Sequence, residues 1–225
     1  MRLASPQSQA LHAPGRQSPH SSANWIRVCP PGSRSRPCWC TGAWADASSW
    51  SGEVATLQAA GYDARAIANP LQDLTIDSEY VADYLKSVKG PIVLVSHSYG
   101  GAVITNAAAG ITNVKALVYV DTAAPAPGET NGQLSVRKAE VLWASQRGAS
   151  TAAFDTPSRA AAWRTIPSWY FISTGDEIIT PQSELMMAHR AHSHITIFHG
   201  GSHLTLISHP DAVTAVIASA ICSAR

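Results

Sequence analysis

The chain has 225 residues, of which 45% are hydrophobic and 14% charged, and its formal net charge at pH 7 is +1. This length and apolar content suit one domain with a sizeable core. The near-zero charge gives no electrostatic basis for binding nucleic acid. No apolar run approaches the roughly 18–20 residues that a membrane-spanning helix needs. We therefore expect a soluble protein that binds neither nucleic acid nor a membrane.

Residues 1–36 are rich in Arg, Ser and Pro and contain no acidic residue. This composition resembles an organelle transit peptide. It equally describes a tail that cannot bury enough apolar surface to fold, and we favour this second interpretation. Because no apolar segment of the secretory type follows the first charge, we expect a cytoplasmic location.

From Ala43 onward, short apolar runs alternate with amphipathic segments, which predicts an α/β fold with a doubly wound, mostly parallel sheet. In chain order we expect a helix over 47–60, a strand over 63–68, a helix over 76–88, a strand from 91 to Ser98, a helix over 101–111 and a strand over 114–120. Residues 125–167 contain helical stretches but no strand pattern, and we expect them to form a small helical cap. A strand over 169–173, a helix over 183–192, a strand over 195–198 and a helix over 212–222 complete the order.

The stretch 91–101 ends a continuous apolar run with Ser-His-Ser-Tyr-Gly-Gly. Ser96 and Gly100 flank Ser98 at two residues on either side, one residue away from the Gly-x-Ser-x-Gly nucleophile elbow. The elbow needs small flanking residues because its turn is strained. Ser96 is small, so this stretch predicts a strand that delivers Ser98 into a tight turn.

Ser98, Asp176 and His203 each follow a predicted strand, in the chain order of the α/β-hydrolase triad. Reactive groups in an open parallel sheet gather at the carboxyl ends of the strands. A serine hydroxyl needs a base to accept its proton, and His203 is the candidate. The imidazole in turn needs a carboxylate on its other nitrogen, which Asp176 would supply.

Each of these three residues also has a simpler explanation. Ser98 could merely cap a helix, as could Asp176 near Pro181. Asp121, also at a strand end, is a rival acid. The rival histidines are His97, His199 and His209. Because three suitable residues at strand ends in the correct order are harder to explain separately, we favour the triad.

The segments Gly-Ala-Trp-Ala-Asp-Ala-Ser-Ser-Trp, Ser-His-Ser-Tyr-Gly-Gly-Ala-Val-Ile and Gly-Ser-His-Leu-Thr-Leu-Ile-Ser-His-Pro resemble compact bacterial α/β-hydrolases related to plant methylesterases and hydroxynitrile lyases. The resemblance covers residues 42–222 and implies a hydrolase domain over 42–225 with its cap at about 125–167. It implies the triad Ser98, Asp176 and His203, with the backbone amides of Ala43 and Tyr99 as the oxyanion hole. It also implies that Trp44, Trp143 and Trp163 either line the substrate pocket or pack within the cap.

Two departures from these relatives bear on function. The hydroxynitrile lyases carry a lysine just after the catalytic histidine, whereas position 204 is Leu, which favours hydrolysis. Relatives also place a strand of the type Val-Leu-Val-His-Gly before Ala-Trp, whereas this chain has Pro-Cys-Trp-Cys-Thr-Gly over 37–42. Codons that encode Pro-Cys-Trp-Cys-Thr-Gly can also encode Val-Leu-Val-His-Gly when they are read with a shift of one base. We hypothesise that residues 1 to about 41 are an out-of-frame translation joined to a normal hydrolase, which would leave the strand beside the elbow poorly formed.

The sequence thus predicts a serine hydrolase that cleaves a small carboxylic ester, with amides and lactones as other substrates of the same chemistry. The alternative is a non-catalytic or inactivated protein of this fold with a defective oxyanion loop. The four cysteines lack zinc-site spacing, and no phosphate-binding or dinucleotide motif occurs. We therefore expect no cofactor and no metal.

Overall fold

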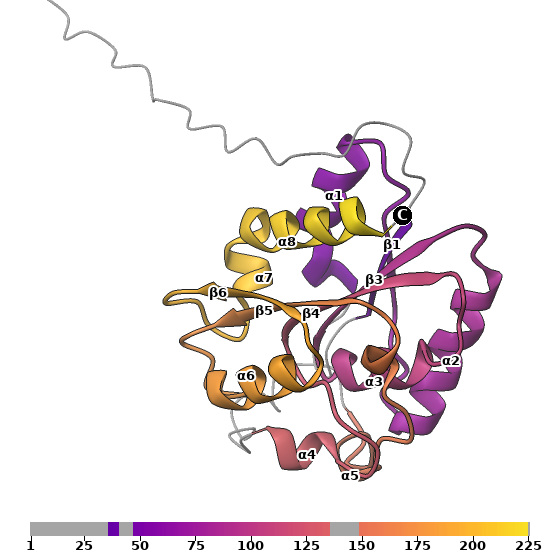
Figure 1. The fold of residues 1–225 in the computed structure, drawn as a ribbon, viewed down its shortest axis with the longest axis vertical. Coiled ribbons are helices and arrows are strands. Elements are labelled where there is room, and N and C mark those ends of the chain that lie inside the picture. Colours follow the sequence, from indigo (N-terminus) through magenta and orange to yellow (C-terminus); the bar gives the residue numbers. More distant parts are fainter. Residues whose placement is uncertain (1–35, 41–46, 136–148, 225) are drawn as a thin grey trace, which may run out of the picture.

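The computed structural model describes residues 36–40, 47–135 and 149–224. In this part of the chain, six strands form one sheet in the order β2-β1-β3-β4-β5-β6, and every neighbouring pair is parallel (Figure 1). The strands are β1 (Arg36–Cys40), β2 (Arg65–Ile67), β3 (Ile92–Ser98), β4 (Val114–Thr122), β5 (Ser168–Ser173) and β6 (His194–Phe198).

Helices cover both faces of this sheet (Figure 1). The 3-10 turn η1 (Ala47–Trp50), α1 (Ser51–Ala59), α7 (Thr205–Ser208) and α8 (Pro210–Ser223) lie on one face. The other face carries α2 (Leu74–Ser87), α3 (Gly100–Ala107) and α6 (Pro181–Arg190). These elements match the predicted alternation of strands and helices, except that α7 was not predicted.

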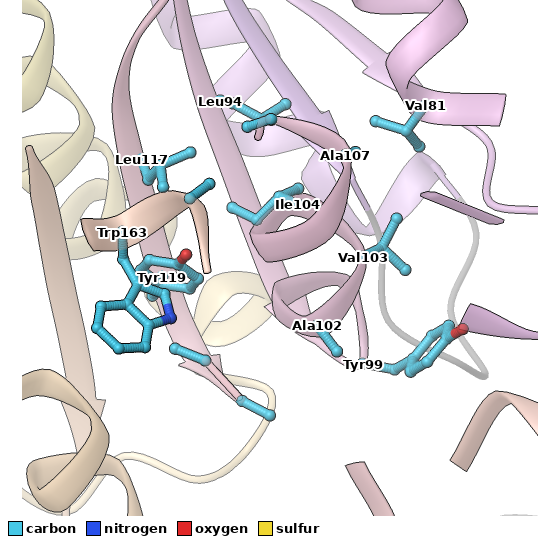
Figure 2. Packing of buried hydrophobic residues seen from close by; sticks show 14 of the residues in the cluster. Val81, Leu94, Tyr99, Ala102, Val103, Ile104, Ala107, Leu117, Tyr119 and Trp163 are labelled. Carbon is cyan, nitrogen blue, oxygen red and sulfur yellow. The ribbon is translucent and has the colours of Figure 1, made fainter. Parts of the chain in front are cut away.

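Alternate residues of the central strands supply two separate cores, as expected for a sheet that is covered on both faces. In β3, Leu94 packs under α2 and α3, whereas its neighbours Val93 and Val95 pack under α1 and α8. Figure 2 shows the first of these layers, with Val103 and other apolar side chains of α3 directed toward the sheet and α2. The central strand β3 therefore begins with a continuous apolar run, residues 92–95, that is buried on both faces.

The strand β1 differs from what its sequence suggests. Residues 36–40, which we assigned to the tail, lie inside the sheet and pair in parallel with β2 on one side and β3 on the other. Along β3 the register runs without a break from Arg36 opposite Ile92 to Cys40 opposite Ser96. The backbone pairing beside the elbow is thus complete, and the poorly formed strand that we expected is not observed. The remainder of the predicted tail, residues 1–35 and 41, lies outside the described residues.

The described parts of the predicted cap contain α4 (Asn131–Leu134), α5 (Ala152–Asp155) and the 3-10 turn η3 (Ala162–Arg164). Asn106 in α3 anchors the returning segment, since its side-chain oxygen accepts hydrogen bonds from the backbone N–H groups of Arg159 (2.8 Å) and Ala160 (2.9 Å). No helix in the described ranges is long and apolar enough to cross a membrane.

Candidate active site

Ser98 stands at the carboxyl end of β3 in a strained backbone conformation. Its φ is +53°, in the left-handed region that residues other than glycine rarely occupy, and only 7% of its surface is exposed. The chain turns directly from Ser98 into α3, which begins at Gly100. A side chain on Gly101 would collide with Thr122 and the carbonyl oxygen of Ala123, so glycine is needed for this close approach to β4. These features are those of a nucleophile elbow.

Ser96, where the elbow motif usually has glycine, is fully buried. Its hydroxyl donates a hydrogen bond to the carbonyl oxygen of Val118 in the neighbouring strand β4, at 3.3 Å. The extra side chain is therefore accommodated and its polar group is satisfied. The imperfect match to the motif does not disturb the turn at Ser98.

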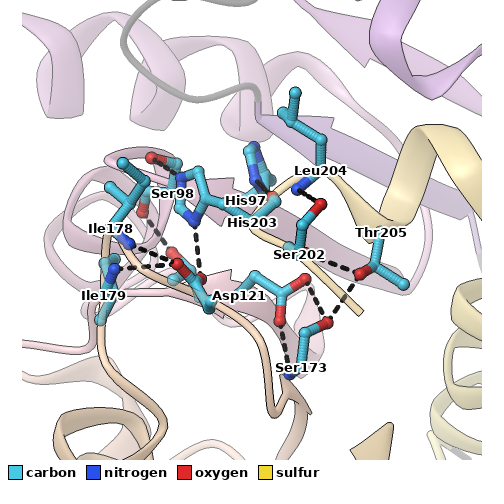
Figure 3. Close-up of polar contacts among 12 residues, drawn as sticks. His97, Ser98, Asp121, Ser173, Ile178, Ile179, Ser202, His203, Leu204 and Thr205 are labelled. Atoms are coloured by element: carbon cyan, nitrogen blue, oxygen red, sulfur yellow. Dashed lines mark hydrogen bonds and ion pairs between the residues drawn. The ribbon is translucent and has the colours of Figure 1, made fainter. Parts of the chain in front are cut away.

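Ser98, His203 and Asp176 form one continuous chain of hydrogen bonds (Figure 3). Nε2 of His203 lies 2.8 Å from Oγ of Ser98, and Nδ1 of His203 lies 2.7 Å from Oδ2 of Asp176. The side chain of Asp176 is fully buried and that of His203 is 13% exposed. The structure thus brings together three residues that stand up to 105 positions apart in the sequence.

The other oxygen of Asp176 is fixed by the backbone of the loop before α6. Oδ1 accepts hydrogen bonds from the N–H groups of Ile178 (2.7 Å) and Ile179 (3.1 Å). Asp176 is therefore not the cap of α6, because Thr180 holds that position and accepts from Ser183 N. With both oxygens engaged, the carboxylate is locked in the orientation that meets His203.

The carboxyl group of Asp121, the rival acid, contacts Ser173 in β5. Its two oxygens accept hydrogen bonds from the backbone N–H (2.8 Å) and hydroxyl (2.9 Å) of Ser173 in β5. The Ser173 hydroxyl lies 2.8 Å from that of Thr205, which donates to the carbonyl oxygen of Ser202 beside His203 (Figure 3). Asp121 thus supports the loop that carries His203. We did not predict this network, and its signal in the sequence is a polar residue at the end of each neighbouring strand.

The carboxyl groups of Asp121, Asp176 and Glu184 lie within 4.8 Å of one another, and all three side chains are buried. Among the residues that the structure describes, they are the one group close enough to share a metal ion. Burial raises the pKa of Asp121 to about 8, and the charge of Asp176 adds to this effect. Burial likewise raises the pKa of Glu184 well above its usual value, with Asp121 and Asp176 contributing. These shifts favour the uncharged forms of Asp121 and Glu184, which lowers the repulsion around Asp176.

The oxyanion hole was predicted from the backbone N–H groups of Tyr99 and Ala43, and only Tyr99 is among the described residues. Tyr99 is the N-cap of α3, and the first backbone N–H groups of a helix have no partner within the helix. Its phenol points away from Ser98 and donates to Oδ2 of Asp77 in α2 at 2.8 Å. Ala43, the other predicted donor, lies outside the described residues.

Of the three tryptophans named for the pocket, Trp44 and Trp143 lie outside the described residues. Trp163 is 8% exposed and belongs to the core layer under α3 (Figure 2). Its indole N–H donates to the carbonyl oxygen of Pro125 at 3.2 Å, and the guanidinium of Arg190 lies 5.4 Å from the ring centroid. These contacts place Trp163 in the packed base of the cap.

Comparison with known proteins identifies the family. A model of the alpha/beta hydrolase family matches residues 39–140 and 128–216, and a search of curated proteins gave no match. A pyrethroid hydrolase from Sphingobium faniae has a TM-score of 0.68 at 20% identity, covering 83% of this chain and 97% of the other. Polyneuridine aldehyde esterase has a TM-score of 0.68 at 12% identity, with 83% and 98% covered. An extracellular alpha/beta-hydrolase from a Paenibacillus species gives 0.65 at 18% identity, with 82% and 98% covered.

The structural likeness extends over nearly the whole of each neighbour. It agrees with the parallel sheet and with the helices on both of its faces. The chain belongs to the alpha/beta hydrolase family and has the α/β-hydrolase fold that its sequence predicted.

Proposed function

We propose that this hydrolase is a serine esterase that cleaves a small carboxylic ester through an acyl-enzyme on Ser98. The observation that carries the proposal is the hydrogen-bonded chain from Oγ of Ser98 through His203 to Asp176, with distances of 2.8 and 2.7 Å. A neighbour named as an esterase supports an ester rather than an amide or lactone as substrate.

In the first half-reaction, Oγ of Ser98 attacks the carbonyl carbon of the ester while Nε2 of His203 accepts the hydroxyl proton. The buried carboxylate of Asp176 stabilises the imidazolium that forms and keeps the ring in the correct tautomer. The backbone N–H groups of Tyr99 and Ala43 would bind the oxyanion. The alcohol then leaves with the proton from His203.

In the second half-reaction, His203 accepts a proton from water, and the water oxygen attacks the carbonyl carbon of the acyl group on Ser98. The bond to Oγ breaks, Ser98 regains its proton from His203, and the carboxylic acid is released. The reaction needs no oxidant and no cofactor. We propose a cytoplasmic enzyme, as expected from the sequence.

Steady-state hydrolysis of short-chain p-nitrophenyl esters and methyl aryl esters tests the proposal. We expect Ser98→Ala to lower kcat by about 10³-fold or more, because a triad without its nucleophile retains little of its activity. Asp211→Asn, in the exposed first turn of α8, is the matched control and should leave kcat unchanged. Undiminished hydrolysis by Ser98→Ala would overturn the proposal and favour a non-catalytic member of the family.

A further inference from the structure

The side chain of His97, next to the nucleophile in β3, reaches across to the main chain of His203 (Figure 3). Its Nε2 lies 2.6 Å from the carbonyl oxygen of His203, and only 3% of the residue is exposed. The centroids of the two imidazole rings are 4.6 Å apart, with an angle of 46° between the ring planes. The ring of Trp50 meets that of His97 edge-on, with the centroids 6.5 Å apart. In the sequence, His97 was considered only as a rival for the catalytic base.

This contact fixes the protonation of His97. A carbonyl oxygen only accepts hydrogen bonds, so Nε2 of His97 must carry the proton. Burial, followed by the neighbouring His203, lowers the pKa of His97 to about 3. The ring therefore stays neutral and donates its single N–H to His203 at neutral pH. It also places no second positive charge beside His203 when that ring becomes an imidazolium.

The contact also joins two parts of the site that the sheet leaves separate. Ser98 lies on β3, whereas the loop that carries His203 follows β6, and two strands stand between them in the sheet. On its far side, this loop is tied to the end of β5 by the bond from Gly175 N to the carbonyl oxygen of Gly201, at 2.8 Å. The hydrogen bond from His97 to the carbonyl oxygen of His203 connects the same loop to β3, which carries the nucleophile.

We propose that His97 is a positioning residue that sets the distance between Ser98 and His203 by hydrogen bonding to the His203 backbone. It takes no part in proton transfer, because its protonated nitrogen is directed at the carbonyl oxygen and not at Ser98. The inference rests on the proposed function, since the distance matters only if His203 is the base for Ser98. A misplacement of about 1 Å in such a pair can cost about 10²-fold in rate.

Two substitutions separate the hydrogen bond from packing. Glutamine carries its amide nitrogen the same number of bonds from Cα as Nε2 of histidine, so His97→Gln can donate to the same carbonyl oxygen. Methionine has a similar length but no donor. In a third variant, His97→Asn, the amide stops at the position of Nδ1 and cannot reach.

The experiment measures kcat and KM for p-nitrophenyl acetate, together with the rate constant for labelling of Ser98 by a fluorophosphonate. We expect His97→Met and His97→Asn to lower kcat and the labelling rate by about 10- to 100-fold with KM little changed, and His97→Gln to restore most of the loss. Thermal unfolding of each variant identifies any that fails to fold. If His97→Met or His97→Asn does so, the other one provides the comparison with His97→Gln.

Equal rates in all three variants and the wild-type chain would overturn the inference, as would a His97→Gln variant that is impaired as strongly as His97→Met and His97→Asn. Ser98→Ala is measured in the same series. If that variant keeps its activity, the proposed function fails. If it is inactive while His97→Met and His97→Asn react at the wild-type rate, only the role of His97 fails.

Discussion

Glu53, on the inner face of α1, should make the stability of this protein fall as pH rises. Its side chain is fully buried, and neither carboxyl oxygen has a hydrogen-bond partner among the described residues. Burial raises the pKa of Glu53 from 4.5 to about 8, and the charge of Asp211 adds to the effect. At about 1.4 kcal/mol per pKa unit, this rise corresponds to about 5 kcal/mol of folding free energy.

The sign follows from proton binding. Between pH 4.5 and about 8 the folded chain keeps a proton on Glu53 that the unfolded chain releases, so the free energy of unfolding decreases through this window. Glu53→Gln keeps the shape of the side chain but cannot ionise. Its stability relative to the wild-type chain should rise from near zero at pH 4 to about 5 kcal/mol above pH 8.

Urea unfolding, followed by tryptophan fluorescence at several pH values from 4 to 9, measures this difference. Glu79→Gln is the matched control, because Glu79 is exposed on α2 and its replacement removes a carboxylate without changing the buried core. A constant difference between Glu53→Gln and the wild-type chain across this range would refute the reasoning.

Three further predictions concern the elbow, the cap and β1. Gly101→Ala should lower both the melting temperature and the rate of Ser98 labelling, because the added methyl group forces α3 away from β4; unchanged labelling would contradict this account of the turn. Arg190→Lys should lower the free energy of unfolding by about 1–2 kcal/mol, measured in urea, since lysine cannot reproduce the paired bonds of 2.7 and 2.9 Å to Glu129; no loss would show that the pair is unimportant. Replacing residues 38–41 by Val-Leu-Val-His should raise stability and labelling if they are an out-of-frame product, and a gene whose shifted frame encodes no such strand would contradict that hypothesis.

Much of the fold could be predicted because local patterns agree with the final structure. The apolar run before Ser98 is a strand buried on both faces. The helix predicted over 76–88 is α2, which begins directly after Asp73, whose side chain caps it by accepting from Ile76 N. That Ser98, Asp176 and His203 would lie together could be predicted, because parallel strands bring their carboxyl ends to one edge of the sheet, and hydrogen bonds join the three side chains in the structure. The geometry then distinguished Asp176 from Asp121, which sequence order alone left as rivals.

What the sequence did not reveal depends on contacts between distant segments. The segment Arg36–Cys40 lacks the usual residues of a central strand, yet it pairs on both sides because β2 and β3 offer matching backbone groups. The role of His97 depends on a carbonyl group 106 positions away. The raised pKa of Glu53 likewise arises from burial between two helices, and no local pattern encodes that burial.

The central claim is that Ser98 is the nucleophile of a working triad. Its most direct test is to treat the folded chain with a fluorophosphonate and to locate the adduct by peptide mass spectrometry. The account predicts one adduct, on Ser98, that is absent in Ser98→Ala and formed far more slowly in His203→Gln. A wild-type chain that remains unlabelled, or that carries its adduct on another residue, would contradict it.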